Sequence, residues 1–178
     1  MTADLPARTR TGTPYRIAVV CLGNICRSPM AGVVLDDRIE RKDLRDMVEV
    51  VTAGTGGWHV GGPMDPRAAA LLTSHGYDAT VHRAQQFGAD WFDDVDLILA
   101  MDSANYVDIV AQGPRAKVRM FRDFDPLVGP GDDARDVPDP YFGGDEGFDE
   151  VLAMVGRTAD AIVDAVARTT VHAAATGD

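Results

Sequence analysis

Residues 16–29 read Arg-Ile-Ala-Val-Val-Cys-Leu-Gly-Asn-Ile-Cys-Arg-Ser-Pro, and this stretch decides how the 178-residue chain is expected to fold. Its first half is an apolar run without a polar face, which is typical of a strand buried on both sides. Gly23 and Asn24 tolerate the left-handed backbone of a tight turn. Ser28 and the proline after it suit the first turn of a helix. We therefore predict a strand that ends at Cys21, a tight loop and a helix N-terminus.

Apolar strands and helical segments alternate along the rest of the chain. Strands are expected at residues 15–21, 47–53, 95–101 and 117–121, and helices after residue 28, at 66–75, at 103–112 and from 148 onward. Such alternation favours parallel βαβ units. We predict an α/β fold: a single domain with an open four-stranded parallel sheet, helices on both faces and an anion-binding loop after the first strand.

The domain is expected to span residues 15–170, between a flexible N-terminal tail at 1–14 and a C-terminal tail at 171–178. Residues 122–147 hold four of the ten prolines and many Asp and Gly residues, so we predict a long irregular segment there. A loop of that length in a compact domain is more often functional than idle.

Composition excludes several classes of function. The net charge of −11 argues against general affinity for nucleic acid or anionic lipid, because both need a basic surface. No apolar run approaches the roughly 20 residues of a membrane span, and residues 1–14 lack the apolar core of a secretory signal. Two cysteines this close in sequence favour a reduced, cytoplasmic setting. We expect a cytoplasmic protein that binds neither nucleic acid nor membrane.

The loop after the first strand has the chemistry of a phosphate site. Its successive backbone N–H groups and the dipole of the following helix would surround an anion, and Arg27 can grip two phosphate oxygens. The same positive field favours a thiolate at Cys21, to which Ser28 can donate a hydrogen bond. The pattern predicts phosphoryl transfer through a phosphocysteine. The predicted phosphate-binding residues are Leu22, Gly23, Asn24, Ile25, Cys26 and Arg27.

Each of these residues also has a plainer interpretation. A lone buried cysteine is usually a small core residue, and Gly-Asn is often only a turn. Cys21 and Cys26 are a conceivable metal pair, but further ligands are missing at useful spacing, because the four histidines are scattered at His59, His75, His82 and His172. The complete string favours the phosphate site, and we expect no metal and no cofactor.

A candidate acid lies in the long irregular segment. Asp139 stands between two prolines, which restrict its backbone and aim its carboxyl group. Beside a bound phosphate and a thiolate, this carboxyl group should keep its proton, as a general acid must. Taken alone, an Asp-Pro pair is nearly always a turn, so the role of Asp139 depends on the Cys21 loop.

The loop at residues 20–29 and the sequence Asp-Pro-Tyr-Phe-Gly at 139–143 together resemble the low-molecular-weight protein tyrosine phosphatases, and the resemblance covers about residues 15–168. It implies that Cys21 is the nucleophile, that Arg27 holds the phosphoryl group, and that Asp139 is first the general acid and then the general base for water.

The same resemblance implies supporting roles around the loop. Asn24 would brace the loop and Ser28 would tune the thiolate, while Thr52 and His82 fall where the family keeps polar residues that support Asn24. Thr52 stands where serine is more usual, and Gln85 stands where arginine is common.

A substrate slot is also implied. Trp58, Tyr141 and Phe142 would wall a deep slot for an aromatic ring, although a half-buried core position is the plainer interpretation of Trp58. Phe142 stands where a second tyrosine is frequent in the family. Cys26 would form a reversible disulfide with Cys21 under oxidation and protect it from irreversible damage.

Three alternative functions share parts of this pattern. Thioredoxin-coupled arsenate reductases need downstream cysteines, and none follows Cys26. A protein-arginine phosphatase tends to carry Thr where Ile25 stands and one aromatic residue in the acid loop. A non-catalytic phosphotyrosine-binding module would not need both Cys21 and Asp139. The sequence thus predicts a protein-tyrosine-phosphatase, with a phosphotyrosine-containing protein as substrate and inorganic phosphate as product and inhibitor, acting as a monomer or weak dimer.

Overall fold

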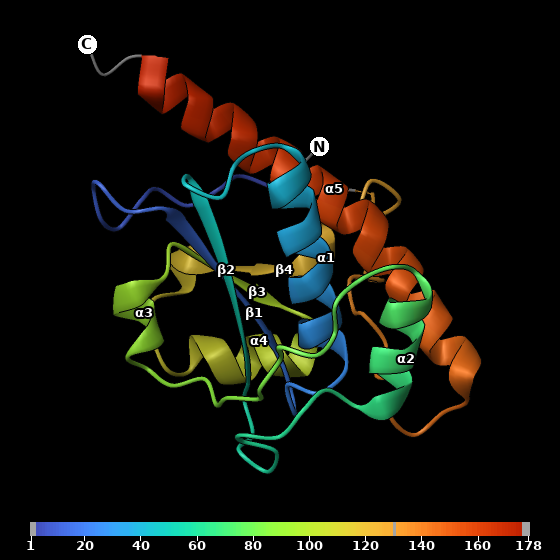
Figure 1. Ribbon diagram of the computed structural model, residues 1–178. Coiled ribbons are helices and arrows are strands. Elements are labelled where there is room, and N and C mark those ends of the chain that lie inside the picture. Colours follow the sequence, from blue (N-terminus) through green and yellow to red (C-terminus); the bar gives the residue numbers. More distant parts are fainter. Residues whose placement is uncertain (1–2, 130, 176–178) are drawn as a thin grey trace.

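The computed structural model describes residues 3–129 and 131–175. Figure 1 shows its strands β1 (Tyr15–Cys21), β2 (Val48–Gly54), β3 (Leu97–Ala100) and β4 (Val118–Met120). The helices are α1 (Arg27–Arg41), α2 (Pro66–Ser74), α3 (Trp91–Asp94), α4 (Ser103–Val110) and α5 (Asp145–Ala175). Two short 3-10 turns, η1 (Arg115–Lys117) and η2 (Phe121–Phe124), flank β4.

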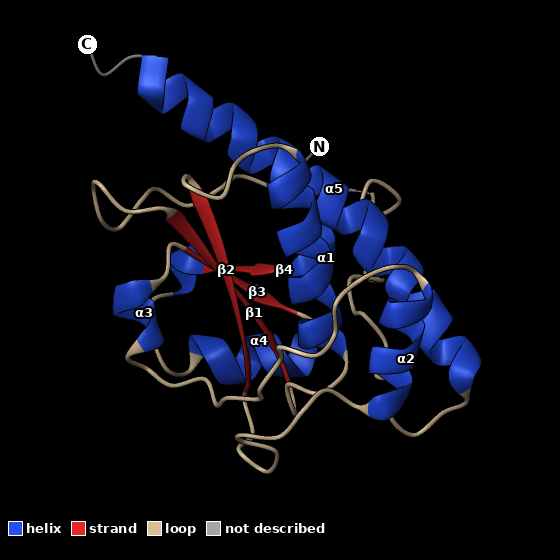
Figure 2. Cartoon of the chain, viewed as in Figure 1, coloured by secondary structure: helices blue, strands red, loops and turns tan. Residues whose placement is uncertain are grey.

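The strands form one parallel sheet in the order β2-β1-β3-β4, which confirms the predicted fold class. Helices α1, α2 and α5 lie on one side of the sheet, and α3 and α4 lie on the other (Figure 2). Side chains alternate along a strand, so Ile17 and Val19 of β1 enter the core under α1 and α5, whereas Ala18 and Val20 enter the second core. Burial on both faces explains why β1 has no polar side.

Helix α5 closes the larger core. Its buried stripe recurs at helical spacing, as expected for an amphipathic helix, and comprises Phe148, Val151, Val155, Ala159, Ile162, Val163 and Val166. The helix begins at Asp145, inside the segment predicted to be irregular, and extends to Ala175. Residues 171–175 are therefore helix rather than tail, in keeping with the good helix-forming alanines there. The rest of the predicted C-terminal tail, 176–178, lies outside the described residues.

Other bounds also differ from the sequence prediction, and one short helix was missed. Strands β3 and β4 are shorter than expected, and α3 was not predicted because its four residues are too few to show a helical period.

None of the helices in residues 3–129 and 131–175 combines the length and the apolar character needed to cross a membrane.

The segment before β1 packs along the domain, which the expectation of a flexible tail did not anticipate. The backbone N–H of Thr9 donates to the Asp96 carboxylate at 2.5 Å, and that carboxylate also accepts from the N–H of Arg16 at 2.8 Å. The Tyr15 hydroxyl donates to the Pro6 carbonyl at 2.9 Å, and Leu5 packs against the larger core. Composition could not indicate the contacts of Thr9 and Arg16, because they depend on a carboxylate about 80 positions away. Residues 1–2 lie outside the described part of the chain.

Candidate active site

Cys21 ends β1 at the carboxyl edge of the sheet, where ligands bind in open α/β folds. Its sulfur lies 3.0 Å from the hydroxyl oxygen of Ser28, and the backbone N–H of Asn24 donates to it at 3.3 Å. The chain turns because Asn24 adopts a left-handed φ of 54°, a conformation that Asn tolerates better than most residues. Helix α1 then starts at Arg27, with its N-terminus behind the loop.

Asn24 fixes the shape of this loop through both ends of its side chain. Its Nδ2 donates to the hydroxyls of Ser28 at 2.8 Å and Thr52 at 3.0 Å, and its Oδ1 accepts from the N–H of Gln85 at 3.0 Å. The ring of His82 donates through Nε2 to the Asn24 carbonyl at 2.7 Å. The structure thus brings together the four predicted supporting residues and adds the backbone of Gln85.

Gly54 lets β2 approach the loop closely. A Cβ at this position would lie 2.7 Å from the Leu22 carbonyl oxygen and 3.1 Å from the Asn24 nitrogen. The two residues after Gly54 donate hydrogen bonds to the loop. The N–H of Thr55 donates to the Cys21 carbonyl and the N–H of Gly56 donates to the Leu22 carbonyl, both at 2.9 Å. The close approach needs a residue without a side chain.

Arg27 is buried, with 2% of its surface exposed, and two carboxylates hold its guanidinium. It donates to Asp102 at 2.6 Å, to the Val137 carbonyl at 3.1 Å and to Asp139 at 3.4 Å. Burial alone would lower the pKa of Arg27, but the charge of Cys21 and the hydrogen bond to Asp102 raise it, so the residue stays cationic. The carboxylates of Asp102 and Asp139 thus fix the orientation of the Arg27 guanidinium beside the loop.

Asp102 is a site residue that sequence reasoning missed. It lies two residues after the end of β3 and is the N-cap of α4. Its Oδ1 accepts from the Asn105 N–H at 2.7 Å, and its Oδ2 accepts from Arg27. A signal was present in the sequence, because an acidic residue follows a buried strand at its carboxyl end, where β1 also delivers Cys21. The pairing with Arg27 could not be inferred without the strand order.

The segment 136–144, here called the acid loop, is pinned beside Arg27. Asp136 accepts from the N–H of Ser103 at 2.8 Å and from its hydroxyl at 2.6 Å, and Val137 N–H donates to the Met101 carbonyl at 2.7 Å. Asp139 accepts from the Tyr141 N–H at 3.1 Å, which orients its carboxyl group. The structure therefore brings Asp139 to the Cys21 loop across more than a hundred positions.

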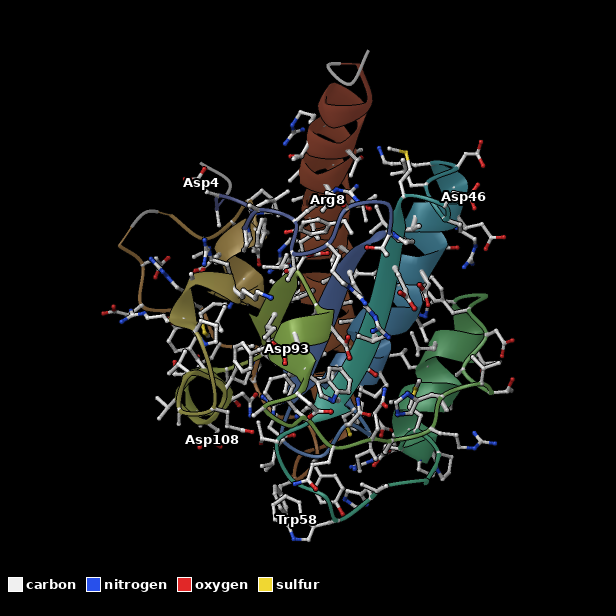
Figure 3. All side chains as sticks on the ribbon, turned by 90° about the vertical axis from the view of Figure 1, so that its left-hand side faces the viewer. Asp4, Arg8, Asp46, Trp58, Asp93 and Asp108 are labelled. Atoms are coloured by element: carbon white, nitrogen blue, oxygen red, sulfur yellow. The ribbon has the colours of Figure 1, made fainter. Side chains whose placement is uncertain are left out.

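A cavity of about 250 Å³ opens over Cys21, and two exposed aromatic side chains stand at its mouth. Trp58 is 73% exposed and Phe142 is 92% exposed, so the alternative interpretation of Trp58 as a half-buried core residue is wrong. Figure 3 shows Trp58 projecting at the edge of the molecule. The lining residues are Cys21, Leu22, Gly23, Ile25, Cys26, Arg27, Trp58, His59, Asp139, Tyr141 and Phe142. Of these, His59 was not predicted.

Cys26 lies buried next to the same cavity. Burial, followed by the charges of Asp65 and Cys21, raises the pKa of Cys26 to about 12, so its side chain is a neutral thiol at physiological pH. Both cysteines are free in the structure. Among the described residues, no group of three or more His, Cys, Asp or Glu side chains is arranged to hold a metal ion.

We expect His82 to lower the free energy of unfolding as the pH drops below neutral. Burial, reinforced by the charge of Arg83, lowers the pKa of His82 below its ordinary value, although the hydrogen bond to Asn24 opposes the shift. As pH falls through about 6.5, the unfolded chain therefore takes up the proton before the folded one does. The free energy of unfolding, measured with denaturant at pH 7.5 and 5.5, should fall less between these pH values for His82→Gln than for the parent protein. Equal losses would contradict this role of His82.

Comparison with known proteins places the chain among relatives of one kind. The sequence model of the family described as "Low molecular weight phosphotyrosine protein phosphatase" matches residues 16–172. A protein of Streptomyces coelicolor named "Low molecular weight protein-tyrosine-phosphatase" is 46% identical over 156 residues, which cover 85% of this chain and 93% of the relative.

Solved structures of phosphatases share the fold of this chain. A protein tyrosine phosphatase from Entamoeba histolytica, with Hepes in the active site, superposes with a TM-score of 0.80 at 29% identity, covering 86% of this chain and 97% of that one. A drosophila arginine phosphatase superposes with a TM-score of 0.74 at 29% identity, covering 83% of this chain and 95% of that one. The fold thus occurs with more than one phosphorylated side chain as substrate.

Proposed function

The chain belongs to the low-molecular-weight phosphotyrosine protein phosphatase family, and from this premise we propose that it hydrolyses phosphotyrosine in proteins through a phosphocysteine intermediate. The predicted enzyme class, a protein-tyrosine-phosphatase among the phosphoric monoester hydrolases, is confirmed by this membership. One observation carries the proposal: Cys21, Arg27 and Asp139 line a single cavity that has aromatic side chains at its mouth.

In the first step, the Cys21 thiolate attacks the phosphorus atom. A sulfur–phosphorus bond forms and the bond from phosphorus to the tyrosine oxygen breaks, while Asp139 gives its proton to that oxygen. Arg27 and the N–H groups of the loop stabilise the charge on the three other oxygens. The position of Asp139, 3.4 Å from the Arg27 guanidinium, supports its access to the leaving group.

In the second step, water attacks the phosphocysteine and Asp139 takes a proton from it. The sulfur–phosphorus bond breaks, inorganic phosphate leaves, and the thiolate returns. The short contact of Ser28 with the sulfur, at 3.0 Å, supports a role for this hydroxyl in stabilising the departing thiolate. Because inorganic phosphate is the product and binds the same loop N–H groups and Arg27, it should also inhibit the hydrolysis of phosphotyrosine.

The slot favours an aromatic substrate. Trp58, Tyr141 and Phe142 offer flat faces on which a phenyl ring can stack, and the rings of Tyr141 and Phe142 are already edge-to-face with centroids 4.9 Å apart. Ile25 adds an apolar side chain to the cavity lining. We further propose action on a phosphotyrosine-containing protein in the cytoplasm, as a monomer or weak dimer, by a catalytic domain spanning residues 15–170.

A protein-arginine phosphatase is the second candidate, since a solved arginine phosphatase shares the fold. An arsenate reductase is less well supported, because no cysteine follows Cys26. The test compares phosphotyrosine peptide, phosphoarginine peptide and arsenate with a thiol reductant, all without added metal. We expect kcat/KM for phosphotyrosine to exceed that for phosphoarginine. A preference for phosphoarginine, or reduction of arsenate without phosphatase activity, would overturn the proposal.

A further inference from the structure

Arg67 sits where the phosphate loop, helix α2 and the acid loop meet. It is the second residue of α2, and its guanidinium is paired through Nε and Nη2 with both carboxylate oxygens of Asp65, each at 3.1 Å. Asp65 is the N-cap of α2, and its side chain also accepts the backbone N–H of Arg67 at 2.9 Å. Both contacts to the carboxylate fix the guanidinium in one plane.

The N-cap residue ties this pair to the phosphate loop. The backbone N–H of Asp65 donates to the carbonyl of Ile25 at 2.9 Å, and Ile25 lies between Cys21 and Arg27 in the loop. Asp65 is itself buried, with 8% of its surface exposed. The start of α2 is therefore fixed relative to the loop that holds the nucleophile.

The other side of the Arg67 guanidinium holds the acid loop. Its Nη2 donates to the Tyr141 carbonyl at 3.0 Å and its Nη1 to the Gly143 carbonyl at 3.5 Å. The guanidinium also lies over two aromatic rings, 4.6 Å from the centroid of Phe148 in α5 and 5.6 Å from that of Tyr141. These contacts grip the acid loop two to four residues after Asp139.

We propose that Arg67 is a positioning residue that holds Asp139 at the working distance from Cys21, an inference that rests on the proposed function. Asp136 and Val137 anchor the first half of the acid loop to the start of α4 and to the residue that follows β3. Arg67 is the corresponding anchor for its second half. With both halves fixed, the carboxyl group of Asp139 cannot drift away from the leaving oxygen. A displacement of about 1 Å at a reacting group can cost on the order of 10²-fold in rate.

The test uses Arg67→Ala and Arg67→Lys in the full chain, with kcat/KM measured for aryl phosphates of decreasing leaving-group acidity. This constant covers substrate binding and the steps up to departure of the aryl oxygen, so it excludes hydrolysis of the phosphocysteine. Its dependence on the leaving group then reports the protonation of that oxygen. Arg67→Ala should lose about 10- to 100-fold with phosphotyrosine, and much less with a leaving group that needs no proton. Arg67→Lys should fall between, because an ammonium keeps the charge but not the paired contact.

Two further variants separate positioning from general damage. In an Asp139→Ala background, Arg67→Ala should add little further loss, since the group it positions is absent. Arg45→Ala is the matched control, because Arg45 also pairs with a carboxylate, Glu40 at 2.9 Å, but is exposed beyond the end of α1. It should keep parental activity. If Arg67→Ala does not fold in a thermal unfolding assay, Arg67→Lys supplies the same comparison.

The outcomes are distinguishable. An equal loss for all leaving groups, or the same fold-loss with and without Asp139, would overturn the positioning role while leaving the proposed function intact. Absence of aryl phosphatase activity in the parent protein would overturn the proposed function and this inference with it.

Discussion

A Cys21→Ser variant should lose about 10⁴-fold or more of its turnover of aryl phosphates, as is typical when the nucleophile of covalent catalysis is removed. A serine hydroxyl is almost fully protonated at neutral pH and is a much weaker nucleophile than a thiolate. The Cys21 sulfur accepts from the Asn24 N–H at 3.3 Å and contacts Ser28 at 3.0 Å. Phosphate binding should survive, because the backbone N–H groups and Arg27 remain.

Two measurements check this expectation. Steady-state hydrolysis of phosphotyrosine peptide gives the loss, and calorimetric titration with inorganic phosphate gives the binding. Cys26→Ser is the informative comparison: Cys26 is a buried thiol in the same loop, and its replacement should cost far less turnover. Substantial residual activity in Cys21→Ser would exclude a phosphocysteine. Loss of both activity and phosphate binding would instead indicate a collapsed loop.

The strand, loop and helix around Cys21 are predictable because the interactions that form them are local. Burial of β1 on both faces shows directly in its apolar sequence. The turn uses the left-handed Asn24, whereas Gly23 does not adopt a left-handed φ, and both lie within a few positions of every other loop residue. Once one βαβ unit is recognised, the parallel sheet follows from the alternation of segments. Hence the fold class and the position of the loop are readable from the sequence.

Contacts between distant segments are less predictable. Asp139 is accessible to sequence reasoning only through a recognisable motif, and Asp102 and Arg67 lack one. Asp102 reaches Arg27 because β3 lies next to β1, and Arg67 reaches the acid loop because α2 packs beside the start of α5. Both depend on the arrangement of elements, which residue types alone do not specify. The same holds for the segment before β1, whose anchor is the buried Asp96.

An Asp139→Ala variant should lose about 10²- to 10⁴-fold of kcat/KM with phosphotyrosine, the range that general acid catalysis contributes. Without an acid, the tyrosine oxygen must leave as a phenolate. The loss should therefore shrink as the leaving group becomes more acidic, and a strongly activated aryl phosphate should be hydrolysed almost normally. Rates across a series of substituted phenyl phosphates give this dependence.

Asp139→Asn distinguishes proton transfer from loop structure. The amide oxygen can still accept the Tyr141 N–H, which Asp139 accepts at 3.1 Å, but the amide cannot act as the acid. Asp139→Asn should therefore lose as much activity as Asp139→Ala. Asp133→Ala, a matched change at an exposed position of the preceding segment, should keep parental rates. If Asp139→Asn stays active, or if both variants lose equally across all leaving groups, Asp139 supports the slot rather than donating the proton, and the acid must come from elsewhere in the cavity.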